Sequence, residues 1–149
     1  MLNGIEIEMR NLSVYNNSPI KKNTIHKLIL LLSHDLKFKI KSLEISFVDS
    51  TIIKEVNRDY LKHNYSTDII TFNYSIEENI IDGEIIISLN DVKNNSIRYE
   101  ISLKQELLRV IIHGLLHLLG YDDVEKTERR RMKVKENFYV KKYTYLLNS

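Results

Sequence analysis

Cysteine is absent from the sequence. Disulfide bonds and thiolate ligands are therefore excluded, and any metal ion must be held by histidine, carboxylate groups and water. No run of about 18 uncharged apolar residues occurs, and the N-terminus has no apolar signal core. We therefore expect neither secretion nor a membrane span, and we predict a cytoplasmic location.

A strong excess of charge is also absent, because the net charge is only +2. This value is too small to indicate nucleic-acid binding, although a basic cluster over residues 129–135 either follows a phosphate backbone or forms a solvated face. Repeats, low-complexity tracts and linkers are lacking. Hydrophobic residues make up 43% of the 149 residues, enough for a buried core. We expect a single domain over residues 1–149.

Hydrophobic periodicity predicts four strands and about five helices. The strands are expected near 5–9, 43–48, 68–74 and 84–89, with Asp82-Gly83 as a turn before the last one. The helices are expected over about 19–36, 50–61, 90–99, 103–119 and 125–146. The second of them is expected to direct Ile52, Ile53, Val56 and Tyr60 inward. Because strands and helices do not alternate strictly, we predict an α+β fold with a small mixed four-stranded sheet packed against about five helices.

The most informative stretch lies near the end of the fourth predicted helix, where His113 and His117 are four residues apart. Positions i and i+4 share one helix face, so both imidazoles point the same way. Gly120 is suited to end the helix, and the returning chain then presents Asp123. A lone histidine on an apolar helix is usually a core residue. This combination instead predicts a metal site with His113, His117 and Asp123 as ligands.

The same stretch argues against a protease. A zincin protease has glutamate directly after its first histidine, and that glutamate acts as the general base. Here the position is Gly114, which has no side chain. A metal held by three protein groups with an open position can still activate water. The pattern therefore indicates hydrolysis without proteolysis, and its helix is similar to the metal helix of zincins.

Three blocks of the sequence resemble the YbeY family of metal-dependent endoribonucleases and occur in that family's order. The third is the metal stretch from His113 to Asp123, and the second is the strand Gly83-Glu84-Ile85-Ile86-Ile87-Ser88. The first block has five matching residues: Asn57, Tyr60, Thr67, Asp68 and Phe72.

The resemblance implies a single-strand-specific endoribonuclease that matures the 3′ end of 16S ribosomal RNA and acts in ribosome quality control. It implies ribosomal RNA and the small subunit as partners, without DNA or membrane, and one Zn²⁺ per chain held by His113 and His117. Asp123 stands where most members have a third histidine. Two histidines and a carboxylate form a known catalytic zinc set, but they also resemble non-haem iron sites, so another divalent metal stays open.

One departure from the family concerns phosphate binding. Most members have an arginine directly after the matched tyrosine, and this chain has Leu61 there. Lys62, His63 and Arg109 are candidate catalytic residues that could supply the lost charge. The alternatives are that Lys62 and His63 are exposed loop residues and that Arg109 forms a salt bridge with Glu106 or a neighbour.

Two other functions remain open at this point. Leu61 favours a non-catalytic ribosome-associated or RNA-binding protein with a structural metal, although structural zinc sites usually have four protein ligands. A metallopeptidase is disfavoured by Gly114. The sequence does not indicate an oligomeric state.

Overall fold

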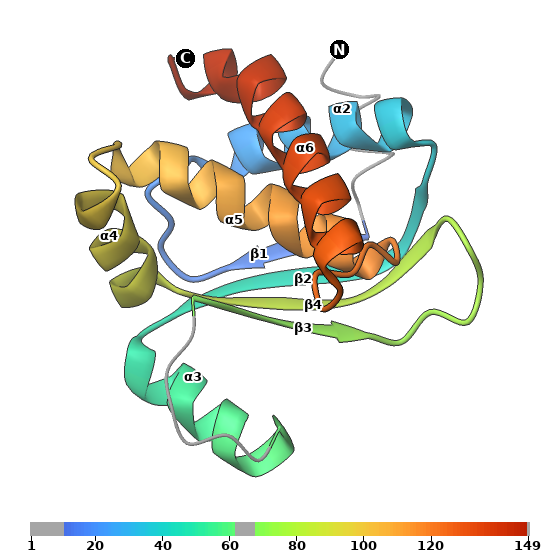
Figure 1. Cartoon of the computed structure of the whole chain (residues 1–149). Coiled ribbons are helices and arrows are strands. Elements are labelled where there is room, and N and C mark those ends of the chain that lie inside the picture. The colour runs from blue at the N-terminus through green and yellow to red at the C-terminus, as the bar shows by residue number, and fades with distance from the viewer. Residues whose placement is uncertain (1–10, 62–67, 149) are drawn as a thin grey trace.

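The structure, a computed structural model, describes residues 11–61 and 68–148, apart from the side chains of Tyr60 and Leu61. The strand expected near residues 5–9 lies outside the described residues. Within them the fold is α+β, as predicted, with four strands in one sheet and five α-helices (Figure 1).

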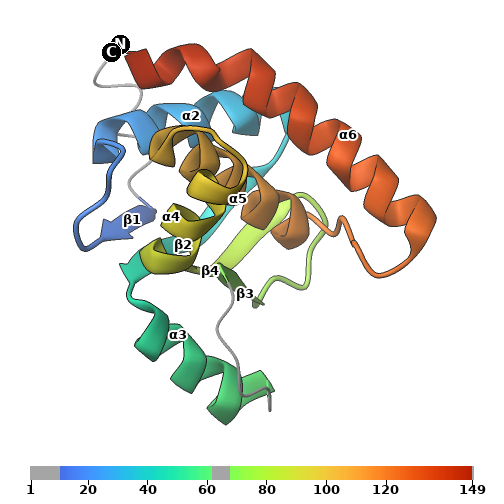
Figure 2. The same cartoon turned by 60° about the vertical axis from the view of Figure 1, so that its left-hand side comes forward.

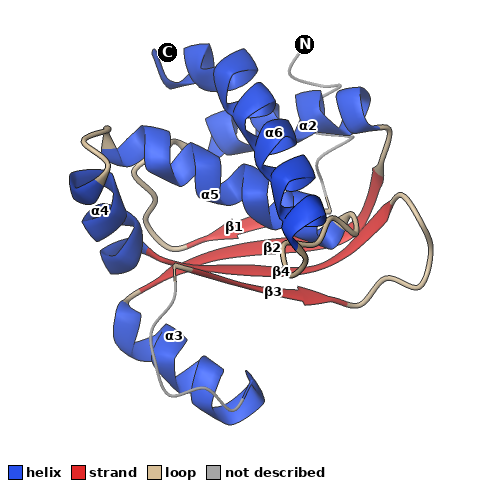
Figure 3. Cartoon of the chain, in the orientation of Figure 1, coloured by secondary structure: helices blue, strands red, loops and turns tan. Residues whose placement is uncertain are grey.

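The sheet has the strand order β1-β2-β4-β3 and is mixed (Figure 3). Strand β2 pairs in parallel with β1 and with β4, while β3 pairs with β4 in antiparallel orientation. The four strands are β1 (Leu12–Tyr15), β2 (Lys39–Val48), β3 (Ile69–Asn73) and β4 (Ile80–Ser88). Alternate residues of β2 and β4 are buried, which directs one face of the sheet toward the helices.

The helices lie on both sides of this sheet (Figures 1 and 2). Helices α2, α5 and α6 cover one face, α4 lies at the end of α5, and α3 stands on the opposite side. Their bounds are α2 (Lys22–Leu36), α3 (Ser50–Val56), α4 (Leu89–Arg98), α5 (Leu103–Leu118) and α6 (Lys126–Tyr143). A π-helical turn, η1 (Asn57–Leu61), extends α3, and a 3-10 turn, η2 (Thr144–Asn148), follows α6.

Helix α5 is the centre of the molecule because it contacts β3, β4, α4, α6 and η2. It is consequently buried on most of its surface, including Leu107, Ile111 and Leu115. Burial of apolar surface of this extent is the main contribution to the stability of such a fold. Among the described helices, none combines the length and the apolar character that a membrane span requires.

Three sequence-based expectations are wrong in detail. Asp82 and Gly83 form no turn, because both lie inside β4, where Gly83 pairs with Asn73 of β3. Ile52 does not face inward and is 45% exposed, whereas its neighbour Ile53 is fully buried. Helix α2 begins at Lys22 rather than residue 19, because the Ser18 hydroxyl accepts a hydrogen bond from the Ile20 amide in a turn that precedes the helix.

Candidate metal site and adjoining pocket

Helix α5 is well defined at both ends, and this orients its two histidines. Ser102 and Gln105 form a capping box, in which each side chain accepts a hydrogen bond from the other residue's amide. At the other end Gly120 adopts a φ of 100°, which favours glycine and turns the chain away from the helix axis. His113 and His117 therefore share one face, with ring centroids 4.7 Å apart.

The three predicted ligands converge. The Nε2 atoms of His113 and His117 are 3.1 Å apart, and the Asp123 carboxylate lies 3.8 Å and 3.5 Å from them, respectively. Ligand atoms that surround one zinc ion tetrahedrally, each about 2.1 Å from it, are about 3.4 Å apart. The donor set therefore fits a metal ion in both chemistry and spacing. Each imidazole is about one-quarter exposed, so the site is open to a substrate.

Asp122 shapes the loop that carries the carboxylate ligand candidate. Its carboxylate oxygen Oδ1 accepts hydrogen bonds from the Asp123 amide at 2.7 Å and the Val124 amide at 3.0 Å. This is the side-chain turn that aspartate commonly forms with the amide two residues on. Asp122 thus holds the backbone in the conformation that directs Asp123 toward the histidines.

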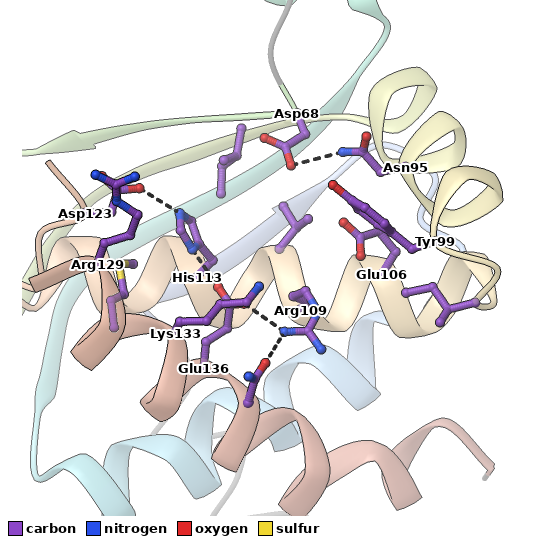
Figure 4. Close-up of a pocket in the computed structure, with 15 residues that line it drawn as sticks. Asp68, Asn95, Tyr99, Glu106, Arg109, His113, Asp123, Arg129, Lys133 and Glu136 are labelled. Carbon is purple, nitrogen blue, oxygen red and sulfur yellow. Dashed lines mark hydrogen bonds and ion pairs between the residues drawn. The ribbon is translucent and has the colours of Figure 1, made fainter. Parts of the chain in front are cut away.

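Glu136 of α6 holds the other side of the His113 ring (Figure 4). The Nδ1–H of His113 donates to the Glu136 carboxylate at 2.6 Å, which leaves Nε2 with its lone pair facing Asp123 and His117. Histidine ligands of metal ions typically have such a carboxylate partner, because it sets the tautomer and the ring orientation. Glu136 is only 3% exposed.

The buried carboxylate is compensated by nearby donors. Burial alone raises the pKa of Glu136, but hydrogen bonds from His113 and Arg109 and the charge of Lys133 outweigh it and lower the pKa to about 2. Burial likewise lowers the pKa of His113, yet the hydrogen bond and negative charge of Glu136 prevail and raise it. Glu136 is therefore ionised at neutral pH, and its negative charge makes the His113 ring more basic.

A pocket of about 470 Å³ extends from His113 and Asp123 along α5 to α4 (Figure 4). Its size is in the usual range for a ligand site. Two cationic side chains, Arg129 and Lys133, line the end nearest the histidines. Asp68, Asn95, Tyr99 and Glu106 are among the residues that line it toward α4.

Of the three predicted catalytic residues, the structure describes only Arg109. Lys62 and His63 lie outside the described residues, as does the side chain of Leu61. Arg109 lines the pocket, and its Nη1 donates to Glu136 at 2.8 Å and to Asn137 at 2.7 Å. The expected salt bridge of Arg109 therefore exists, with Glu136 rather than with Glu106 as its hydrogen-bonded partner.

Gly114 lacks the general base of a protease, and its small size also allows close packing of α5 on the sheet. A Cβ atom at this position would lie 2.7 Å from Cδ1 of Ile69 and 3.2 Å from Cδ1 of Ile85. Helix α5 thus packs closely against β3 and β4, and a side chain longer than one methyl group would have to displace Ile69 and Ile85. A glutamate of the protease kind would point into the sheet rather than toward the histidines.

Sequence reasoning missed Glu136, although a signal for it exists. Helix α6 buries Met132, Glu136, Tyr139 and Tyr143, which recur at helical spacing. A carboxylate inside an otherwise apolar or aromatic stripe needs a buried partner, and such a residue is a candidate for a site.

The chain is similar to known proteins over most of its length. The profile of the family described as "Endoribonuclease YbeY" matches residues 6–144. The chain is 44% identical over 107 residues to the Endoribonuclease YbeY of Chlorobium limicola, which covers 72% of this chain and 74% of the relative. It is 37% identical over 134 residues to that of Chlorobium phaeobacteroides, covering 89% and 94%.

A solved structure has the same fold. The solution structure of a protein from Thermotoga maritima superimposes with a TM-score of 0.64 and 26% sequence identity. The match covers 89% of this chain and 88% of the other.

Proposed function

The chain belongs to the Endoribonuclease YbeY family, and from this premise we propose that it is a metal-dependent endoribonuclease that processes ribosomal RNA. We further propose that the resident metal is Zn²⁺ and that the substrate is single-stranded RNA at the 3′ end of the 16S species. The small ribosomal subunit is the proposed partner, and the cytoplasm is the proposed location. Residues 1–149 are proposed to act as one domain.

One observation carries the proposal: ligand atoms of His113, His117 and Asp123 lie within 4.8 Å of one another beside a pocket. Two imidazoles and a carboxylate are a known catalytic zinc set. Three protein ligands leave a position open, whereas structural zinc sites usually have four. The partial exposure of both imidazoles supports an open, catalytic site.

When bound, the metal supplies Lewis acidity toward phosphoryl oxygens and lowers the pKa of water. The protein's own residues provide the rest of the proposed mechanism. Glu136 holds the proton of His113 at Nδ1 and thereby keeps Nε2 available as a donor atom. Arg129 brings positive charge to the same end of the pocket and attracts the phosphate backbone. Lys133 also lines this end, but its Nζ donates to the Glu136 carboxylate at 3.1 Å and so helps to compensate that buried charge.

Arg109 has a supporting role in this proposal. Its guanidinium is engaged by Glu136 and Asn137, so it compensates the buried carboxylate rather than offering its Nη1 atom to a phosphate. Lys62 and His63 remain candidates for a direct phosphate contact, because they follow Leu61 at the position where most family members have arginine.

The test is cleavage of a single-stranded RNA with the sequence of a 16S 3′ end, compared with the same strand in a duplex. We expect cleavage of the single strand, its loss with a chelator and its return when Zn²⁺ is restored. His117→Ala should reduce the rate at least 100-fold, while His34→Ala, which changes an exposed histidine on α2, should not.

Cleavage that survives both the chelator and His117→Ala would contradict the proposal. Metal and RNA binding without cleavage by the unmodified chain would instead favour an RNA-binding protein with a structural metal.

A further inference from the structure

Glu106 is a buried carboxylate that the proposed metal site does not use. It is 3% exposed, and its Oε1 atom has no hydrogen-bond partner among the described residues. It lies seven residues before His113 and therefore on the same face of α5, two turns or about 10 Å away. This distance is on the scale of one nucleotide.

Glu106 forms one end of the pocket together with Asp68, Asn95 and Tyr99, and we call this end the base pocket. The Asn95 amide donates to the Asp68 carboxylate at 3.5 Å. Tyr99 is 59% exposed, and Figure 4 shows its ring and the Glu106 carboxylate pointing into the same space, across from Asp68. An exposed aromatic ring beside a cavity is a surface on which a nucleobase can stack.

The negative charges near the base pocket disfavour a phosphate there. Burial raises the pKa of Glu106, Arg109 opposes this rise, and the negative charges of Asp68 and Glu136 add to it. The Nη1 atom of Arg109 donates to Glu136 and Asn137. Because the Asp68 carboxylate and the unpaired Oε1 atom of Glu106 face this space, the matching ligand is one that presents N–H donors.

We propose that the base pocket binds one nucleobase of the RNA and selects bases that carry an exocyclic amino group over uracil. The proposal rests on the proposed function, because it assumes an RNA that passes the metal site. Adenine, cytosine and guanine each present an amino group, whereas the single N–H of uracil lies between two carbonyl oxygens that the carboxylates repel. A site built to accept a hydrogen bond discriminates strongly against ligands that lack the donor.

The stability of the free protein provides an independent sign of this role. A buried oxygen without a partner destabilises the fold, and such groups are rare in native structures. Glu106 therefore fits a residue retained for ligand binding at the expense of stability. Its replacement by leucine should stabilise the fold and abolish base selection together. If Glu106 were purely structural, its replacement by leucine would destabilise the fold and leave base selection unchanged.

The first experiment measures calorimetric binding of four ribonucleoside 5′-monophosphates and inorganic phosphate to the zinc-loaded full chain. We expect AMP, CMP and GMP to bind at least about tenfold more tightly than UMP. In Glu106→Leu the four affinities should lie within about twofold of one another, while the affinity for phosphate is unchanged. Glu44→Leu is the matched control, since Glu44 is half-buried on β2 and points to the opposite face of the sheet from the core residue Ile45.

The second experiment measures thermal unfolding of the same proteins without nucleotide. Glu106→Leu should raise the melting temperature by about 2–4 °C, as expected when a buried unpaired polar group is removed from a chain of this size. Glu106→Gln preserves the side-chain size and should retain folding while reducing the preference for amino-bearing bases several-fold.

Several results would overturn the base pocket. One is binding of UMP that is as tight as, or tighter than, binding of AMP, CMP and GMP. Another is a lower melting temperature of Glu106→Leu with its base preference intact. A third is a second bound metal ion that Glu106→Leu removes. Cleavage assays with RNAs that differ at one nucleotide separate the two proposals. Cleavage without base preference would refute the base pocket alone, whereas base-selective binding without cleavage would refute the proposed enzyme activity.

Discussion

His113 is constrained on both sides of its ring, and this explains how a helix and a loop can present a precise set of donor atoms. Glu136 fixes the Nδ1 side at 2.6 Å, and Nε2 faces His117 and Asp123. The ring therefore has little freedom to rotate away before a metal binds. Such preorganisation reduces the cost of forming the site.

The first prediction at the residue scale concerns Glu136. Glu136→Ala should weaken metal binding about 10–100-fold, because the tautomer and orientation of His113 are no longer set. Glu136→Gln retains an acceptor and should recover part of the loss. Competition with a chromophoric chelator measures the metal affinity of both variants. Glu128→Ala, which changes a residue on the same helix, is the control. Equal affinities in all four proteins would show that Glu136 does not position His113.

The second prediction concerns acid stability of the metal-free protein. The pKa of Glu136 is lowered from 4.5 to about 2, so its ionised form stabilises the fold. This contribution is fully present above about pH 4.5 and is lost as the pH falls through 2; its size is about 3 kcal/mol. Glu136→Gln should remove this pH dependence from the free energy of unfolding, measured with urea between pH 2 and pH 6. If the free energy of unfolding of that variant still fell by the same amount at low pH, the effect could not come from Glu136.

The third prediction concerns Asp122, which is no ligand candidate but orders the ligand loop. Asp122→Ala removes the acceptor for the Asp123 and Val124 amides and should weaken metal binding about 3–10-fold, the cost of about one hydrogen bond. Asp122→Asn keeps that acceptor and should bind nearly as tightly as the natural chain. Loss of the entire site in Asp122→Asn would mean that the charge of Asp122 itself contacts the metal.

The proximity of the three candidate ligands could be predicted from sequence, because their geometry is local. His113, His117 and Asp123 come together because one helix and one glycine turn connect them, and spacing alone specifies this. Glu136 could not be found in the same way, since it arrives from α6 and its contact depends on how two helices pack. The absence of a partner for Glu106 is likewise a property of tertiary structure.

At the scale of elements, two glycines allow β4 and α5 to pack closely against β3. Gly83 lies on β4, where a Cβ would be 2.3 Å from the Phe72 carbonyl oxygen. Gly114 lies on α5, where the nearest atom is the flexible end of the Ile69 side chain. The same added methyl group thus meets backbone in one case and a movable side chain in the other.

The corresponding prediction compares Gly83→Ala with Gly114→Ala. Gly83→Ala should cost about 3 kcal/mol in free energy of unfolding, because the backbone of β3 must move. Gly114→Ala should change stability by less than about 1 kcal/mol, since the helix propensity of alanine offsets the repacking. Chemical denaturation of both variants checks this, and equal costs would contradict the difference in what the two methyl groups meet.

Elements with a strong internal pattern were predicted well, and those defined by pairing were not. Helix α5 begins after Ser102 as expected because its cap is encoded locally. Strand β2 begins four residues earlier than predicted, because parallel pairing with β4 extends it to Lys39. Asp82-Gly83 favours a turn locally, but pairing of β4 with both neighbours keeps it extended.

For the whole molecule, the position of α6 links stability to the site. Its C-terminal end is tied to α2, because Asp35 accepts hydrogen bonds from Lys142 at 2.9 Å and from the Tyr143 hydroxyl. Its middle brings Glu136 to His113, and the loop before it carries Asp123. The α+β class and the mixed sheet were predictable from the order of elements, whereas this convergence of α5, α6 and the loop on one pocket was not.

The most direct test of a catalytic metal site is the rate of single-stranded RNA cleavage as Zn²⁺ is added stepwise to metal-free protein. The rate should rise in proportion to metal up to one equivalent per chain and then stay constant, and His117→Ala should show no rise over the same range. Full cleavage by the metal-free chain, or an unchanged titration in His117→Ala, would contradict a metal site at His113, His117 and Asp123 that carries the reaction.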